Sequence, residues 1–333
     1  MAKHIEKSKI SIVLCTYNGE QFIKEQLNSI LNQTYQVHEI IIQDDCSTDN
    51  TWCIISNYQH IYPNLIKTYK NKTNIGPHAN FKSAFSRATG DYIAPSDQDD
   101  IWYPDKIETL LKTIENQELC FSQEKILFEN SEEQISIEMM QPIEKLIWSN
   151  NLKGHTFLFK RDLLKFYQYT EELSFDYVLA LSTCIRNTYS HTNKVLSVWR
   201  RHANVCTFAV LRNSTFNIKQ ISSTKKMCVS MKKLLLGKSK SPAIMQSFTN
   251  RANLIKILTG NDKKLKIISE LLKNVAKQSF FSYIKAGYLN IRLLYFGEEF
   301  RQYSFKKKIG AILFAFKTPY IYWYDLHLEK SLE

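Results

Sequence analysis

The sequence lacks the short motifs that would name its chemistry at once. Only 9 of its 333 residues are glycine and 7 are proline. No G-x-G-x-x-G follows the first predicted strand and no G-x-x-x-x-G-K-[ST] occurs anywhere, which argues against a dinucleotide-dependent oxidoreductase and a P-loop nucleoside triphosphatase. The seven cysteines show no C-x-x-C or zinc-like spacing. We therefore expect reduced thiols in a cytoplasmic protein.

Long apolar segments are also missing. The N-terminus, Met1 to Lys9, is polar and has no apolar stretch of the kind found in secretory signals. The best apolar run, Ile309 to Phe316, is far too short to cross a bilayer. With 44% hydrophobic and 23% charged residues, the composition is that of a globular protein with a core. The net charge of +12 favours anionic partners, namely nucleotides, nucleic acid or an anionic membrane face.

The first 116 residues alternate between strand and helix signals. Residues 9–15 form a nearly continuous apolar and β-branched run, which is typical of a strand buried on both faces. Apolar residues at helical spacing follow it. Strands are predicted at 9–15, 39–43, 65–69 and 91–95, and helices at 22–31, after 47–49, at 76–88 and at 104–116. This alternation predicts an α/β fold with a mostly parallel sheet flanked by helices.

The rest of the chain is less regular. Residues 117–151 are acidic and permit no assignment, whereas strands are predicted at 154–160 and 194–200 and helices at 162–167 and 175–186. Beyond residue 207, lysine and arginine dominate and strand signals fade, which predicts a helical extension. The predicted organisation is a catalytic domain over 1–207, with a nucleotide-sugar-binding half at 1–116 and an acceptor half at 117–207, and a basic helical region over 208–333.

Polar motifs follow four of the predicted strands, at residues 15–18, 44–47, 74–76 and 97–100. The carboxyl ends of parallel strands lie along one sheet edge, so these motifs are expected to converge there. The densest motif holds Asp97, Asp99 and Asp100. Carboxylates this close require a cation or an exposed position. Their hard oxygens suit Mg²⁺ or Mn²⁺, which usually share their ligands with substrate phosphates. The alternative is a solvated turn.

These motifs carry a family resemblance. Thr16-Tyr17-Asn18, Asp44 to Thr51, Asn74-Ile75-Gly76 with Asn80, and Ser96 to Trp102 with Pro104-Asp105-Lys106 resemble the family-2 glycosyltransferases with a GT-A fold. The resemblance spans roughly residues 8–116, and Asp97-Gln98-Asp99-Asp100-Ile101-Trp102 is most similar to bacterial rhamnosyltransferase-like enzymes of surface polysaccharide synthesis. It implies an inverting transferase that uses Mn²⁺ or Mg²⁺ to move a sugar from a nucleoside-diphosphate sugar to a glycan or lipid-linked acceptor.

The resemblance also implies roles for individual residues. Asp44 would accept hydrogen bonds from the nucleobase, and Arg200 and Arg201 would neutralise phosphate charge. Asp99 would bind the metal directly. The donor-binding set is Thr16, Tyr17, Asp44, Asn74, Gly76, Asn80, Asp97, Gln98, Arg200 and Arg201, and the metal set is Asp97, Asp99 and His202.

Asp176 is the implied catalytic base. It opens the helix at 175–186, and its apolar neighbour Phe175 is expected to raise its pKa by desolvation. The alternative is a helix cap, with Glu171 and Glu172 as substitute bases. Four nearby polar residues have other expected roles. Asp45 and Asp49 are expected in turn or cap contacts, and Asp100 behind the metal ligands or as a helix cap. His155 either touches the acceptor or, as we favour, only fills space.

Two questions stay open at this level. The basic, aromatic segment 306–324 is either a solvated helical surface or an attachment to the anionic cytoplasmic leaflet. The rival functions are a nucleotidyltransferase, which would carry a glycine-rich basic loop where Thr16 to Glu20 stands, and a degenerate, non-catalytic nucleotide-sugar-binding protein. No nucleic-acid-binding motif is present, so we expect no nucleic-acid partner.

Overall fold

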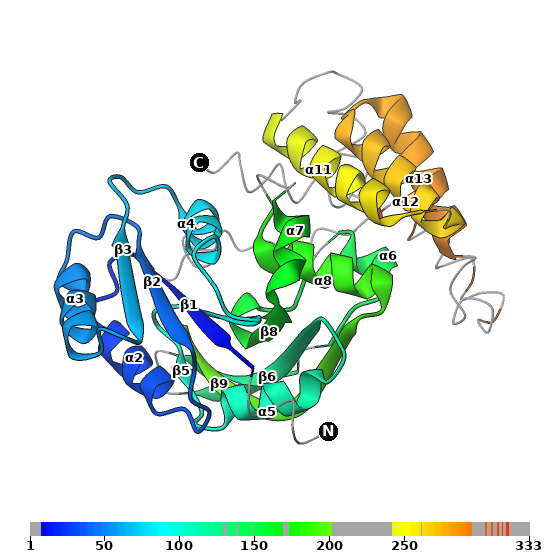
Figure 1. Ribbon diagram of the computed structural model, residues 1–333. Coiled ribbons are helices and arrows are strands. Elements are labelled where there is room, and N and C mark those ends of the chain that lie inside the picture. The colour runs from blue at the N-terminus through cyan, green and yellow to red at the C-terminus, as the bar shows by residue number, and fades with distance from the viewer. Residues whose placement is uncertain are drawn as a thin grey trace. The chain divides into compact units, whose positions relative to one another are not determined.

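The structure is a computed structural model that divides into two compact units (Figure 1). The first comprises Met1–Ile143, Ser149–Tyr169 and Ser174–His202, and the second Glu144–Trp148, Thr170–Leu173 and Ala203–Glu333. The residues that the structure describes are 8–128, 132–137, 139–148, 150–168, 173–201, 242–260, 262–294, 304, 308, 312, 315, 318 and 319.

The first unit is built on a nine-stranded sheet within the described residues. The strands are β1 (Ile10–Thr16), β2 (Glu39–Asp44), β3 (Ile66–Lys70), β4 (Tyr92–Ser96), β5 (Ile101–Trp102), β6 (Leu119–Phe128), β7 (Glu133–Ser136), β8 (Phe157–Lys160) and β9 (Tyr189–Arg201). Their order is β3-β2-β1-β4-β8-β6-β9-β5, and β7 pairs with β6. β1 to β4 pair in parallel, whereas β8 joins β4 and β6 antiparallel.

Helices cover both faces of this sheet. They are α2 (Ile23–Leu31), α3 (Thr51–Ile61), α4 (Pro77–Phe85), α5 (Lys106–Ile114), α7 (Leu164–Tyr167) and α8 (Phe175–Arg186), with short 3₁₀ turns η1 (Gly154–Thr156) and η2 (Arg161–Leu163). The short helix α6 (Ile143–Leu146) belongs to the second unit from residue 144 on. α2 and α3 lie on the opposite side of the sheet from α4 (Figure 1). Asp105 precedes α5 at its N-cap position, so Asp100 does not cap that helix.

The core explains why the first strands were readable from the sequence. Every residue of β1 is buried, as expected of a strand covered on both faces. Ile10, Ile12 and Leu14 pack with the apolar face of α2, which supplies Ile23 and Leu27. Apolar residues that repeat every second position along β1 thus pack in one core cluster with apolar residues that repeat at helical spacing along α2.

Glu39, at the start of β2, is a buried carboxylate with a full set of partners. It accepts hydrogen bonds of 2.7 Å from Lys67 Nζ, Ser11 Oγ and the backbone nitrogen of Thr89. Burial alone would raise the pKa of Glu39, but these hydrogen bonds outweigh it and lower the pKa from 4.5 to about 2. The ionised carboxylate therefore ties β2 to β1, β3 and the turn before β4.

The segment that the sequence left unassigned, 117–151, contains β6, β7 and α6. β6 lies between β8 and β9 and pairs in parallel with β9, whose partner residues begin 70 positions later along the chain at Tyr189. The predicted strand at 154–160 begins as the η1 turn and becomes β8 at Phe157. The second half of the sheet is therefore mixed, whereas the first half is parallel.

The second unit contains three described helices, α11 (Pro242–Leu258), α12 (Lys263–Ala276) and α13 (Phe280–Leu294). Asp262 caps α12 by accepting a hydrogen bond of 2.9 Å from the backbone nitrogen of Leu265. The α/β fold with a helical C-terminal extension is thus confirmed. Among the described residues, no helix has both the length and the apolar character required to cross a membrane. The five described cysteines form no disulfide bond with one another.

Candidate active site

The predicted convergence of polar motifs at one sheet edge is present in the structure. β1 and β2 end together, because Thr16 pairs with Asp44 in the parallel register. β4 lies on the other side of β1, with Ser96 opposite Leu14. The loop that follows β4 therefore starts beside the ends of β1 and β2. This is the carboxyl edge at which open α/β sheets bind their ligands.

Asp44 is fully buried at this edge. Its carboxylate accepts hydrogen bonds from Thr16 Oγ1 at 3.0 Å, from Ser47 Oγ at 2.5 Å and from the backbone nitrogen of Ser47 at 2.9 Å. Thr16 is buried as well, whereas Tyr17 is 45% exposed. In this state Asp44 fixes the turn after β2, and Tyr17 offers its ring to solvent. Their contacts with a nucleobase stay a prediction.

The loop that carries Asn74 and Gly76 is held by Asp45. The Asp45 carboxylate accepts hydrogen bonds from the backbone nitrogens of Ile75 at 2.9 Å and Gly76 at 2.8 Å. Asn80 is buried on α4 and donates to a backbone carbonyl of β2 at 3.0 Å. Asp45 therefore has a structural role, but it holds the loop before α4 rather than its own turn. The donor contacts of Asn74, Gly76 and Asn80 stay predictions.

Gln98 joins the Asp97–Asp100 loop to the end of β1. Its Oε1 accepts from the backbone nitrogen of Tyr17 at 2.9 Å, and its Nε2 donates to the Tyr17 carbonyl at 3.0 Å. Gly19 makes this approach possible, because a Cβ atom there would lie 2.2 Å from Gln98 Oε1. The Gln98 amide thus acts first on the protein's own backbone, and its contact with a donor stays a prediction.

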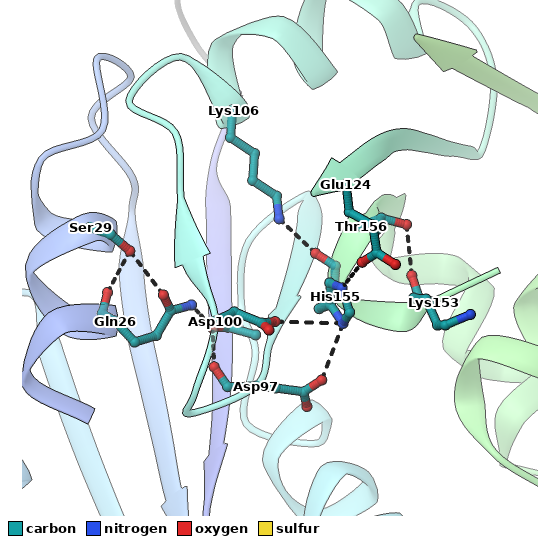
Figure 2. A network of polar contacts seen from close by, with 10 residues as sticks. Gln26, Ser29, Asp97, Asp100, Lys106, Glu124, Lys153, His155 and Thr156 are labelled. Carbon is teal, nitrogen blue, oxygen red and sulfur yellow. Dashed lines mark hydrogen bonds and ion pairs between the residues drawn. The ribbon is translucent and has the colours of Figure 1, made fainter. Parts of the chain in front are cut away.

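His155 is the centre of a buried charge network behind the Asp97–Asp100 loop (Figure 2). Its Nδ1 lies 3.3 Å from Asp97 Oδ2 and 3.5 Å from Asp100 Oδ2, and its Nε2 lies 2.5 Å from Glu124 Oε2. The side chain of His155 is 5% exposed, and those of Asp100 and Glu124 are fully buried, whereas that of Asp97 is 46% exposed. The expectation that His155 only fills space is wrong, because its ring links carboxylates from two segments.

These surroundings raise the pKa of both His155 and Asp100. Burial alone would lower the pKa of His155, but the charge of Asp100 and the contacts with Asp97 and Glu124 raise it well above its usual value. Burial raises the pKa of Asp100 well above its usual value, although the His155 charge opposes the shift. The charges of Asp97 and Asp99 add to that rise. Asp100 therefore needs a cation beside it to stay ionised.

Lys106 holds the backbone of this network in place. It is fully buried at the start of α5, and its Nζ donates to the backbone carbonyl of His155 at 2.6 Å. The same Nζ lies 4.1 Å from the ring centroid of Trp102. Burial lowers the pKa of Lys106 to about 7, against the attraction of Asp100. The contact fixes the η1 turn and so aims the imidazole at the Asp97–Asp100 loop.

Asp97, Asp100 and His155 form a group that can hold a metal ion, since one ligand atom from each lies within 4.8 Å of the others. Both carboxylate oxygens of Asp100 are buried without a hydrogen-bond partner among the described residues. Such oxygens suit a divalent cation. Asp99, the predicted direct ligand, is partly exposed next to this group, and its ligand role stays a prediction.

Asp176 lies in the first turn of α8, where its Oδ1 accepts from the backbone nitrogen of Tyr177 at 2.8 Å. Burial raises the pKa of Asp176, although hydrogen bonds from Ser174 and Tyr177 oppose the shift, and the charge of Asp97 adds to it. The raised pKa expected from the sequence is confirmed. Because Asp97 acts on it, Asp176 belongs to the same electrostatic environment as the metal-capable group.

Phe175 sets the start of α8 against η1. Its ring packs with those of Phe81 and Phe85, at centroid distances of 4.9 and 5.1 Å. A Cβ atom on Gly154 would lie 2.3 Å from Phe175 Cζ. The missing side chain of Gly154 therefore lets α8 approach η1, which brings the turn of His155 and the helix of Asp176 together.

The two arginines at the end of β9 already have partners. Arg200 Nη2 lies 2.5 Å from Glu25 Oε2, and the Arg201 guanidinium lies 4.5 Å from the ring centroid of Trp199. A phosphate contact from Arg200 would compete with Glu25, and both phosphate roles stay predictions. Three predicted residues lie outside the described residues: the metal ligand His202 and the substitute bases Glu171 and Glu172.

Sequence reasoning missed Glu124 and Lys106, and each left a signal. Glu124 stands in β6, where residues 119–124 are all buried, so an acid there requires a partner inside the protein. Lys106 lies four residues before Leu110, on the apolar face of α5. A charged residue at a core position of an amphipathic element points to a buried network.

Comparisons with known proteins agree with this geometry. Residues 11–173 match the family model described as Glycosyl transferase family 2. An uncharacterized glycosyltransferase of Methanocaldococcus jannaschii is 33% identical to 57% of this chain, over 69% of its own length. This chain belongs to glycosyl transferase family 2. The dTDP-rhamnosyl transferase RfbG of Shigella flexneri is 39% identical to this family-2 chain over 34% of the chain and 42% of RfbG.

The fold has a solved counterpart. The crystal structure of S. aureus TarS 1–349 in complex with UDP-GlcNAc resembles this family-2 protein with a TM-score of 0.50 and 19% identity. The likeness covers 83% of this chain and 89% of that one. At this identity it concerns the fold alone. The chain spans 59% of the length of the first curated relatives that it matches.

Proposed function

We propose that this family-2 protein is an inverting, metal-dependent glycosyltransferase that moves a sugar from a nucleoside-diphosphate sugar to a hydroxyl of a glycan or lipid-linked saccharide in bacterial surface polysaccharide synthesis. One observation carries the proposal. The pKa of Asp176 is raised by burial, and the charge of Asp97 adds to this rise. Asp97 in turn belongs to a group that can hold a cation. A proton acceptor and a metal that assists the leaving group are the two requirements of such a transfer.

In the proposed reaction, Asp176 accepts the proton of the acceptor hydroxyl while that oxygen attacks the anomeric carbon. The bond from this carbon to the β-phosphate oxygen breaks on the opposite face, so the configuration inverts and the nucleoside diphosphate leaves. Burial of Asp176 favours its neutral form, which makes it a better proton acceptor than an exposed carboxylate. Bound Mn²⁺ or Mg²⁺ would offset the charge that develops on the diphosphate.

The ligands that we propose for the cation from the family resemblance are Asp97, Asp99 and His202. The described part of the site fits a divalent ion. The Asp97 side chain is 46% exposed and accessible to an incoming ion, and the buried oxygens of Asp100 behind it have no hydrogen-bond partner among the described residues. Carboxylates of this kind bind hard cations that keep further positions for phosphate oxygens.

For the donor we propose two kinds of contact. Tyr17, with its exposed ring, would stack on the nucleobase. The side chains of Asp44, Asn80 and Gln98 are hydrogen-bonded to the protein backbone, and they would hold the loops whose backbone contacts the nucleotide. The full proposed set is Thr16, Tyr17, Asp44, Asn74, Gly76, Asn80, Asp97, Gln98, Arg200 and Arg201. RfbG is named for dTDP-rhamnose transfer and TarS was crystallised with UDP-GlcNAc, so the donor test includes both nucleotides.

We propose further that the second unit contacts the anionic inner face of the cell membrane, where a cytoplasmic enzyme would meet a lipid-linked acceptor. α13 presents Phe281, Ile284 and Tyr288 on one exposed stripe, with exposed fractions of 81%, 37% and 59%. Lys285 and Arg292 are exposed on the same stripe of α13, and Lys285 also forms an ion pair of 2.7 Å with Glu270 of α12. Aromatic groups beside basic ones suit the headgroup region.

The test begins with a thermal-shift panel of UDP-, dTDP-, GDP- and CMP-sugars, each with and without Mn²⁺. One nucleotide should stabilise the protein in a metal-dependent way. If no nucleotide sugar shifts the melting temperature of the folded protein, a degenerate binding protein is favoured. Release of pyrophosphate from a nucleoside triphosphate would favour a nucleotidyltransferase.

The base assignment has its own test. Asp176→Asn should abolish transfer and leave donor stabilisation nearly unchanged, since the amide cannot accept the proton. Asp162→Asn, at an exposed position of η2, is the matched control and should behave as wild type. Full transfer activity in Asp176→Asn would refute the assignment.

A further inference from the structure

The two ring nitrogens of His155 have different surroundings. Nε2 lies 2.5 Å from Oε2 of Glu124, whose side chain is fully buried. An ionised carboxylate only accepts hydrogen bonds, so Nε2 carries the hydrogen of this contact. A cation that replaces the proton on Nδ1 could then bind the lone pair of this nitrogen. Figure 2 shows this nitrogen facing Asp97 and Asp100 rather than the Glu124 side.

The spacing around Nδ1 is that of ligands around one ion. An octahedral ion with bonds of about 2.1 Å separates neighbouring ligand atoms by about 3 Å. Nδ1 lies 3.3 Å from Asp97 Oδ2 and 3.5 Å from Asp100 Oδ2, and the three ligand atoms lie within 4.8 Å of one another. The oxygens of Asp100 are buried and make no hydrogen bond within the described chain, which leaves them available to an ion.

We propose that Nδ1 of His155, rather than the His202 ring, is the nitrogen ligand of the divalent cation, together with Asp97 and Asp100, and that Glu124 is a positioning residue that fixes the ring and its tautomer. The proposal rests on the proposed function only for the use of that cation in catalysis. A carboxylate behind a metal-bound imidazole orients the ring and strengthens its basicity. Lys106 supports the arrangement from the backbone side, through the His155 carbonyl.

The charges agree with this assignment. The buried Lys106 is attracted by the charges of Asp100, Glu124 and Asp97, although its hydrogen bond goes to the His155 carbonyl. A divalent ion between Asp97 and Asp100 would offset the negative charge of these two carboxylates. The competing arrangement is a protonated imidazolium in the same place, which would hold the carboxylates by charge and bind no metal.

A nitrogen ligand also affects which metal the site prefers. Mg²⁺ keeps to oxygen ligands and water, whereas imidazole binds transition-metal ions. The site is therefore expected to prefer Mn²⁺ over Mg²⁺, and the His155 ring is expected to carry that preference.

The experiment uses the full-length protein and Mn²⁺ alone, without donor or acceptor. Electron paramagnetic resonance gives the Mn²⁺ affinity, and electron spin echo modulation detects a nitrogen bound to Mn²⁺. Wild-type protein should show this modulation, and labelling with ¹⁵N-histidine should change its frequency. His155→Gln should lose the modulation and the preference over Mg²⁺, whereas His60→Gln, at an exposed position of α3, should keep both. Glu124→Gln should weaken Mn²⁺ binding roughly tenfold to a hundredfold.

Two further results keep the proposal open to refutation. If His155→Gln does not fold, His202→Gln in labelled protein decides, because retained histidine coupling supports His155 and lost coupling assigns the nitrogen to His202. Bound Mn²⁺ without nitrogen coupling, or no Mn²⁺ binding by an active wild-type enzyme, would overturn the inference and leave the transferase function standing. Histidine-coupled Mn²⁺ in a protein without transferase activity would do the reverse.

Discussion

A single methyl group on Gly154 should disturb the site through the ring of Phe175. The added Cβ would lie 2.3 Å from Phe175 Cζ and 2.6 Å from Cε2, whereas carbon atoms pack at about 3.5–4.0 Å. The ring must therefore retreat by more than about 1 Å. It has little room, since Phe81, Phe85 and Tyr167 surround it at centroid distances of 4.9, 5.1 and 6.5 Å. Overpacking of this kind costs about 1–3 kcal/mol.

The catalytic effect of Gly154→Ala should exceed its effect on binding. Asp176 follows Phe175 directly in α8, so the retreat of the ring moves the base. A displacement of about 1 Å at a reacting group lowers a rate by about a hundredfold. We expect kcat to fall by that order, urea unfolding to report a loss of about 1–3 kcal/mol, and the donor-induced thermal shift to stay close to wild type.

The double variant Gly154→Ala/Phe175→Leu tests the mechanism directly. Leucine occupies less of the space that the new methyl group needs, so Phe175→Leu should recover part of the lost stability in the Gly154→Ala background while costing stability in the wild-type background. Groups in direct contact show coupling energies of about 0.5–3 kcal/mol in such cycles. Additive effects of the two changes, or a wild-type kcat in Gly154→Ala, would refute the reasoning.

Three more outcomes follow from the contacts described above. Glu39 has a pKa of about 2 in the folded protein against an ordinary 4.5. Its ionised form therefore adds about 3 kcal/mol to the free energy of unfolding above pH 4.5, and this contribution is lost as the pH falls through 2. In urea unfolding, the free energy of unfolding of Glu39→Gln should lie below that of the wild type by that amount at pH 7 and by less at pH 3. Gly19→Ala should push the Gln98 amide away from the β1 loop and reduce the donor-induced thermal shift; an unchanged shift would show that this clamp does not matter for the donor. Phe281→Ser should weaken sedimentation with phosphatidylglycerol vesicles but not with neutral phosphatidylcholine vesicles, and equal binding by both proteins would remove α13 from the membrane proposal.

The first half of the sheet could be predicted because its signals are local. β1 is buried along its whole length, and a polar turn and an amphipathic helix follow it at once. The order of the parallel strands then places Thr16 and Asp44 together without further information. The convergence of the motifs is a consequence of βαβ connectivity, which the sequence pattern reveals.

The second half could not be predicted because its signals depend on distant partners. The sequence of β6 mixes apolar, polar and acidic residues and shows no clear strand pattern. It forms a central strand because β8 and β9 pair with its two edges. Glu124 is tolerable there only because His155 lies 2.5 Å away, and no local pattern connects two residues 31 positions apart. A buried charge is stable only with a partner. Its position can therefore be predicted from the sequence only when its tertiary neighbours are known.

The same charges explain why an anionic donor can approach a site built from carboxylates. Asp97, Asp99 and Asp100 repel a diphosphate. Lys106 is directed inward to a backbone carbonyl, and the His155 ring is already held by Glu124, Asp97 and Asp100. The chain's net charge of +12 does not remove this repulsion, because salt screens exposed charges that lie more than about 10 Å from the donor. A divalent cation beside Asp97 would neutralise the carboxylates and so remove their repulsion of the diphosphate. It would also leave coordination positions for phosphate oxygens. Donor binding and metal binding should therefore strengthen each other, and each must be measured with the other present and absent.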